Sequence, residues 1–173
     1  MVHSVELLFD RDTETAVRRI WDDLAELGLP SQAAHTAPSN RPHVTLTVAD
    51  RMDDGVTAAV RPALGRLPLD CRIGAPMVFG GRVVTLVRLV VPSVELLALQ
   101  AEVHRLCLPH MPDGPLPNVQ HGAWTPHVTL ARRMAPDQLP QALGLRRLGR
   151  EIRGRAAALR HWDGNAKVVH PID

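Results

Sequence analysis

The residues best suited to chemistry in this chain of 173 residues belong to one five-residue segment, Pro-His-Val-Thr-Leu, which occurs twice. The histidines of the two copies, His43 and His127, are 127 − 43 = 84 positions apart. In a β-strand, residues two positions apart project from the same face. Each copy therefore presents an imidazole beside a hydroxyl, which comes from Thr45 in the first copy and from Thr129 in the second.

Two imidazoles and two hydroxyls are suited to acid–base chemistry on a phosphate group. Both protonation states of histidine are available near neutral pH, so one ring can accept a proton while the other donates one. Threonine hydroxyls can donate hydrogen bonds to the non-bridging phosphate oxygens, whose negative charge grows in the transition state. We therefore predict that His43 and His127 are catalytic and that Thr45 and Thr129 bind phosphate, in a reaction that needs no metal.

The repeated segment has two other interpretations. Threonine favours strands in any case, and a histidine in a strand can be an ordinary packed residue; two identical copies in matching surroundings weigh against this explanation. A metal site would need a third or fourth ligand at a suitable spacing. His35, His121 and several aspartates are present, but none lies in a recognisable ligand pattern, and we predict no metal.

Arginines lie close to both copies. Arg41 is two residues before His43, and Arg132 and Arg133 follow the second copy. Strand alternation places Arg133, rather than Arg132, on the face of His127. A guanidinium pointed at the site would suit an anionic substrate, although an arginine at such a position can equally be solvated. Arg41 and Arg133 are therefore candidate supporting residues.

Three further side chains could serve the same site. Trp124, three residues before the second histidine, and Trp162, at the last predicted turn, could stack on a base or pack on the core. Glu6 lies in the middle of the first predicted strand, where it could orient a histidine or face water. His35 and His121 lie in the loops that lead to the two copies, and we expect both to be exposed.

The periodicity of the apolar residues predicts the elements that position these side chains. The predicted strands cover residues 2–9, 43–49, 69–79, 83–91, 126–132, 150–161 and 166–170. The predicted helices cover about 11–27, 53–65, 93–106 and 136–144. The order strand, helix, histidine strand, helix, strand thus occurs twice, with one strand added at the end, so the repeat extends beyond the five shared residues.

Composition bounds the class of protein. Hydrophobic residues make up 45% of the chain, enough for a core, whereas 3% aromatic residues argue against a nucleic-acid binder that stacks many bases. The net charge of +2 is compatible with a phosphate-bearing substrate. Cys71 and Cys107 follow no metal or redox spacing, as is typical of reduced thiols in a cytosolic protein. No signal peptide or membrane-spanning run is evident, so we expect a cytoplasmic protein.

Two His-x-Thr motifs, half a chain apart in a chain of this length, resemble those of the 2H phosphoesterases, and within them the bacterial 2′-5′ RNA ligase and cyclic phosphodiesterase branch. The resemblance implies a two-lobed fold with pseudo-twofold symmetry, a cleft between the lobes, and activity without metal or ATP. It also implies that His43 and His127 form the acid–base pair and that Thr45 and Thr129 bind phosphate. It does not settle which histidine is the base.

From these observations we expect an α+β fold in which two mostly antiparallel sheets face a central cleft and the helices lie outside. Residues 1–173 should form a single two-lobed domain with repeat units at about 1–80 and 82–173. The expected function is that of a phosphodiesterase acting on 2′,3′-cyclic phosphate or 2′-5′ phosphodiester ends of RNA or nucleotides, with possible reverse ligation.

The alternative from a different class is a non-catalytic module that binds RNA ends or nucleotides in the same cleft, and a metal-dependent hydrolase is a third candidate. RNA ends or cyclic nucleotides are the expected partners. We expect no cofactor, no membrane association and no protein partner, and therefore a monomer.

Overall fold

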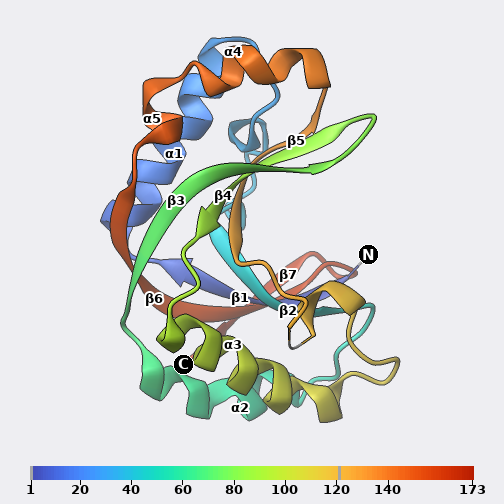
Figure 1. The fold of residues 1–173 in the computed structure, drawn as a ribbon. Coiled ribbons are helices and arrows are strands. Elements are labelled where there is room, and N and C mark those ends of the chain that lie inside the picture. Colours follow the sequence, from blue (N-terminus) through green and yellow to red (C-terminus); the bar gives the residue numbers. More distant parts are fainter. Residues whose placement is uncertain (1, 121) are drawn as a thin grey trace.

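The structure is a computed structural model that describes residues 2–120 and 122–173, so the prediction for His121 lies outside the described residues. It is an α+β fold with antiparallel strand pairing, as predicted (Figure 1). The strands are β1 (His3–Phe9), β2 (His43–Ala49), β3 (Leu69–Gly80), β4 (Val84–Val90), β5 (His127–Met134), β6 (Ile152–Asp163) and β7 (Val168–Ile172). The α-helices are α1 (Arg11–Glu26), α2 (Val56–Val60), α3 (Val94–Cys107), α4 (Leu139–Leu143) and α5 (Arg146–Gly149).

The order of the strands makes the internal repeat visible. The sheet runs β2-β1-β6-β3-β4-β5, and β7 pairs with β6. Equivalent strands of the two halves of the chain begin 84 − 3 = 81, 127 − 43 = 84 and 152 − 69 = 83 residues apart. Each occupies the same position counted from its own edge of the sheet, so a pseudo-twofold axis passes between β6 and β3. The repeat boundary at about residue 81 stays a prediction.

The two sheets expected from the sequence are two halves of one hydrogen-bonded sheet. The long strands β3 and β6 join them, because the first part of each pairs with the other strand. The second part of β3 then pairs with β4, and the second part of β6 pairs with β7, while β1 lies along its other edge. Each lobe therefore contains strands from both halves of the chain, and Figure 1 shows β3, β4 and β5 arching over β1, β2 and β6.

The helices cover the outside of this bent sheet. In Figure 1, α1, α4 and α5 lie together beyond β3 and β5, and α2 and α3 lie beyond β1 and β2. Helix α1 begins where Asp10 caps it, with the Thr13 amide donating to Asp10 Oδ1 at 2.9 Å. None of the helices in the described part of the chain is long and apolar enough to cross a membrane.

One predicted helix is shorter than expected. The prediction covered residues 53–65, but only Val56–Val60 are α-helical, and Arg61–Arg66 form a 3₁₀-helix. Pro62 explains the change, because proline has no amide hydrogen to donate and its ring crowds the preceding turn of an α-helix.

Candidate active site

The bend of the sheet brings its two edge strands together. β2 and β5 are the first and last strands of the sheet order, yet they are in contact. Between the lobes lies a cavity of about 710 Å³, and all four motif side chains line it: His43, Thr45, His127 and Thr129. A larger depression of about 1140 Å³ lies elsewhere and involves none of these residues. The structure thus unites two segments that are far apart in the sequence in one site.

Every residue of the repeated segment has the same position in both copies. The Val and Leu of each copy are fully buried, whereas the His and Thr are half-buried at the cavity; the buried set is Val44, Leu46, Val128 and Leu130. Alternation along a strand produces this division between core and cleft. The segment therefore encodes packing as well as chemistry.

A β-bulge follows the threonine in each copy. In β2, Thr45 pairs with Glu6 and Thr47 with the preceding residue of β1, which leaves Leu46 without a partner. In β5 the residue without a partner is Leu130, at the same position of the motif. A bulge reverses the alternation beyond it and commonly lies beside an active site, where it re-aims side chains. It turns the next residue of each strand, Thr47 or Ala131, into the buried interior.

The two imidazoles are oriented in the same way. His43 Nδ1 lies 2.7 Å from the carbonyl oxygen of Arg41, and His127 Nδ1 lies 2.7 Å from that of Thr125. Because a carbonyl oxygen can only accept, Nδ1 carries the proton in each ring, and the neutral imidazole keeps Nε2 as its acceptor. The proline that starts each copy favours an extended conformation at the residue before it, which supplies this carbonyl.

The backbone at the two threonines is held by tryptophans. Trp124 Nε1 donates to the carbonyl of Thr45 at 2.9 Å, and Trp21 Nε1 donates to that of Thr129 at 3.1 Å. Within residues 2–120 and 122–173, neither threonine hydroxyl has a protein hydrogen-bond partner. Both hydroxyls thus remain available to a ligand in the cavity.

The surroundings of the two histidines differ. Burial lowers the pKa of His127, and the nearby positive groups His43 and Arg132 lower it further, against the opposing hydrogen bond to Thr125. The ring of Phe79 meets His127 edge-on, with 4.9 Å between centroids. By contrast, the carboxylate of Glu6 lies 3.5 Å from Nε2 of His43. The half-sites share a backbone geometry but not an electrostatic environment.

The supporting residues suggested by the sequence divide into two groups. Trp124 and Glu6 both line the cavity, as does Trp162, and His35 is exposed. Phe79 also lines the cavity, although no sequence pattern pointed to it. Its signal was weak: it is an aromatic residue at the end of a strand, directly before the hairpin glycines.

The prediction that Arg133 faces the site was wrong. Arg132 lines the cavity instead, and Arg133 adopts the left-handed region with φ 55°. The bulge at Leu130 and a second register shift before Met134 reverse the strict alternation on which the prediction rested.

The guanidinium of Arg41 also points away from the cavity. It pairs with Glu14 of α1, with 2.6 Å between Arg41 Nη2 and Glu14 Oε2. Arg41 contributes its carbonyl oxygen to His43 instead. No cluster of three or more His, Cys, Asp or Glu side chains able to hold a metal ion occurs among the described residues.

Comparison with known sequences identifies a family. The model of the 2′-5′ RNA ligase superfamily matches residues 10–165. A search of curated proteins gave no match.

Several solved structures share the fold over nearly their whole length. TT0787 of Thermus thermophilus has a TM-score of 0.60 at 15% identity, and the alignment covers 100% of this chain and 96% of that one. E. coli LigT complexed with 3′-AMP has a TM-score of 0.55 at 12% identity, with 99% and 94% covered. Usb1 of Kluyveromyces marxianus with uridine monophosphate has a TM-score of 0.52 at 12% identity, with 98% covered in both.

Proposed function

Since this chain belongs to the 2′-5′ RNA ligase superfamily, we propose that it is a metal-independent phosphodiesterase acting on 2′,3′-cyclic phosphate or 2′-5′ phosphodiester ends of RNA or nucleotides. Family membership by itself supports an enzyme with phosphodiesterase-like activity. The observation that carries the finer proposal is the pair of half-sites: two imidazoles with Nδ1 bound to carbonyls, and two hydroxyls, line one cavity.

In the proposed reaction, one histidine accepts a proton at Nε2 from the attacking water as the new phosphorus–oxygen bond forms. The bond from phosphorus to the leaving ribose oxygen breaks, and the other histidine donates a proton from Nε2 to that oxygen. One proton is taken up and one is released, so the pair returns to its starting state after proton exchange with solvent. With an RNA hydroxyl in place of water, the reversal of cleavage would be ligation without ATP.

The proposed roles of Thr45 and Thr129 follow from their free hydroxyls. Each can donate a hydrogen bond to a non-bridging phosphate oxygen, from opposite walls of the cavity. LigT complexed with 3′-AMP and Usb1 with uridine monophosphate favour a nucleotide ligand for this cavity as well. Trp124, Trp162 and Phe79 line it and are the side chains on which a base could stack.

The test is turnover of 2′,3′-cyclic uridine monophosphate by protein treated with EDTA. We expect hydrolysis to a nucleoside monophosphate, and loss of about 10²–10⁴-fold in kcat for H43A and for H127A. H35A is the matched control, because His35 is an exposed histidine outside the cavity. Wild-type rates in either motif variant, or strict dependence on an added divalent metal, would contradict the proposal. Binding of the product without turnover would favour the non-catalytic module.

A further inference from the structure

Glu6 is a buried carboxylate in the wall of the cavity. It lies on β1 between Thr45 of β2 and Arg160 of β6, and its side chain is only 5% exposed. Its Oε1 accepts a hydrogen bond from the Ser4 hydroxyl at 2.8 Å and lies 3.5 Å from Nε2 of His43. A carboxylate removed from water in this way requires a compensating partner.

Arg160 is that partner. Its Nε donates to Oε2 of Glu6 at 2.7 Å, and its side chain is 6% exposed. The guanidinium also donates, through Nη1, to the carbonyl of Ser39 at 2.8 Å. Arg160 therefore fixes Glu6 and, at the same time, the loop that leads to His43.

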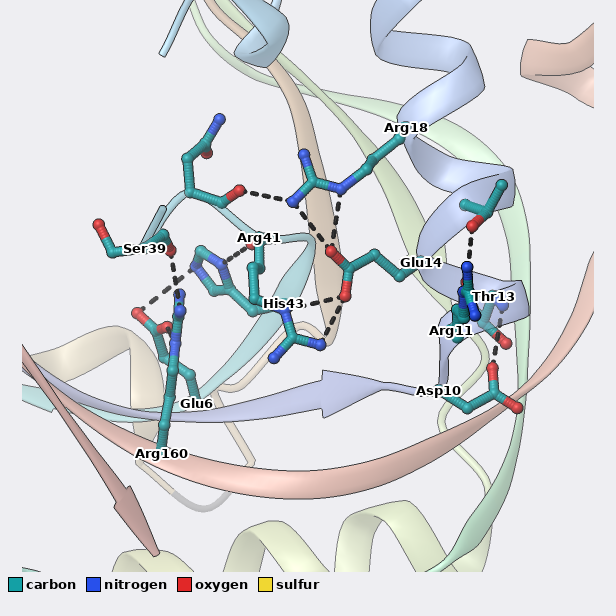
Figure 2. A network of polar contacts seen from close by, with 12 residues as sticks. Glu6, Asp10, Arg11, Thr13, Glu14, Arg18, Ser39, Arg41, His43 and Arg160 are labelled. Carbon is teal, nitrogen blue, oxygen red and sulfur yellow. Dashed lines mark hydrogen bonds and ion pairs between the residues drawn. The ribbon is translucent and has the colours of Figure 1, made fainter. Parts of the chain in front are cut away.

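That loop, residues 39–41, is held at each of its three carbonyls (Figure 2). Ser39 accepts from Arg160, Asn40 accepts from Arg18 at 2.8 Å, and Arg41 accepts from His43 Nδ1. The side chains of Arg18 and Arg41 both pair with Glu14 of α1. His43 is thus gripped at Nδ1 by an anchored loop and approached at Nε2 by an anchored carboxylate.

The second half-site has no counterpart of this arrangement. Val87 pairs with Thr129 as Glu6 pairs with Thr45, and Met77 pairs with Val87 as Arg160 pairs with Glu6. Among the residues that the structure describes, no carboxylate forms an ion pair with His127. Its neighbours are instead the Phe79 ring and the positive Arg132.

We infer that Glu6, held by Arg160, is a positioning residue that makes His43 the proton donor of the pair and leaves His127 as the proton acceptor. This inference rests on the proposed function. A protonated Nε2 of His43 has a negative partner, whereas a protonated His127 faces only apolar and positive groups. Arg160 balances the charge of Glu6, so a protonated His43 still leaves a positive pocket for the phosphate.

The charged groups that face His43 come from several elements. They are Glu6 on β1, Arg160 on β6, His127 and Arg132 on β5, and Arg41 with Glu14 beside the loop. Of these, only Glu6 carries a negative charge next to Nε2. Removal of this one charge therefore changes the protonation of His43 with little direct effect on His127.

The first experiment needs no turnover: NMR titration of the His43 and His127 rings in the wild type and in E6Q. Glutamine keeps an oxygen for Arg160 but removes the charge. We expect the pH at which His43 titrates to fall by about one unit in E6Q, with no change at His127. No change at His43, or equal changes at both rings, would overturn the inference.

The kinetic arm uses the leaving group. With 2′,3′-cyclic uridine monophosphate, E6Q should move the alkaline limb of kcat/KM to lower pH. With a uridine 3′-(4-nitrophenyl phosphate), in which nitrophenolate leaves without a proton, H43A should lose less than about tenfold and H127A should still lose at least about 10²-fold. The reverse pattern would assign the roles the other way. Absence of wild-type turnover would contradict the proposed function and leave the titration result standing.

E14Q is the matched control, because Glu14 is also a carboxylate clamped by arginine in the same network but lies away from the imidazole ring. It should leave both titrations in place, even if the loop is loosened and kcat falls. E6D supplies a second variant should E6Q fold poorly, since it keeps the charge for Arg160 but retracts it from His43. A shift in E14Q as large as in E6Q would show a purely structural effect and contradict the inference.

Discussion

The two half-sites are alike in backbone and unlike in charge. Both copies place the imidazole on a carbonyl two residues earlier, follow the threonine with a bulge, and receive a tryptophan N–H on the threonine carbonyl. Around His43 lie Glu6 and Arg160, while Val87 and Met77 hold the equivalent positions beside His127. The geometry that two-sided proton transfer needs is thus repeated, whereas the surroundings that would separate an acid from a base are not.

The same contrast occurs on the other face of the first lobe. His3, His161 and His170 stack across β1, β6 and β7, with centroids 5.3 and 5.4 Å apart. His3 Nε2 also lies 3.2 Å from Asp163. By strand position, the second lobe has valines where the first has His3 and His161, namely Val84 and Val78. Charge and titration are therefore concentrated in the lobe that contains His43.

The largest expected effect tests whether the two histidines act as one unit. H43A and H127A should each reduce kcat by about 10²–10⁴-fold, because each removes one side of the proton transfer. The double variant should be no more than about tenfold slower than the slower single variant, since groups that act together are not additive. Steady-state turnover of the cyclic nucleotide measures this. A double loss equal to the product of the single losses would mean two independent roles.

The threonines test whether the phosphate lies midway between the half-sites. T45V and T129V should each reduce kcat by about 10²-fold, with a smaller change in KM, because each removes one donor to a developing charge. T45S and T129S should retain most of the activity.

Thr47 provides the control for these variants. Its hydroxyl binds His104 Nδ1 at 2.9 Å outside the cavity, so T47V should keep its turnover. A difference of more than about tenfold between T45V and T129V would place the phosphate off centre.

The histidine stack tests the contrast in stability. Burial, together with the adjacent His3 and His170, lowers the pKa of His161 to about 4. The unfolded chain binds a proton at this residue near pH ~6.5 that the folded chain does not, so stability falls as pH falls between these values. The free energy of unfolding should drop by about 2 kcal/mol from pH 7 to pH 5, because each pKa unit between the two states corresponds to ~1.36 kcal/mol.

H161Q should remove that loss, as urea unfolding at pH 7 and pH 5 would reveal. The exposed His35 gives the control variant H35Q, which should keep the full dependence on pH. An unchanged dependence in H161Q would mean that the stack does not set the acid sensitivity of the first lobe.

The tryptophans should give the smallest effects. Trp21 is 2% exposed and Trp124 is half-buried at the cavity. W21F leaves the Thr129 carbonyl without its donor and should lower the free energy of unfolding by about 1 kcal/mol. W124F should mainly raise KM, because it changes the cavity lining. Thermal unfolding and KM measured on both variants would separate these roles, and identical profiles would contradict them.

The sequence contained the parts of the site that depend on short-range pattern. The repeated segment, its alternation and its strand context predicted that His43, Thr45, His127 and Thr129 would share a face within each copy. The order of elements predicted the α+β fold. These features are local, so residues two to four positions apart determine them.

The parts that the sequence did not predict depend on pairing between distant strands. The bulge that turns Arg132 toward the cavity and Arg133 away is a mismatch between β4 and β5, and no local pattern announces it. Glu6 could not be assigned because its partner, Arg160, is 154 residues away. The exchange of β3 and β6 between lobes has the same origin, since strand order depends on pairing rather than on periodicity.

A crystal structure with uridine vanadate would show whether the two half-sites act on one phosphorus. Vanadate mimics the five-coordinate transition state of in-line displacement, so both apical oxygens can be located. We predict one apical oxygen within hydrogen-bonding distance of His43 Nε2, the other within that distance of His127 Nε2, and equatorial oxygens at Thr45 and Thr129. Vanadate bound to one half-site alone, with the other histidine out of reach, would contradict a shared reaction centre.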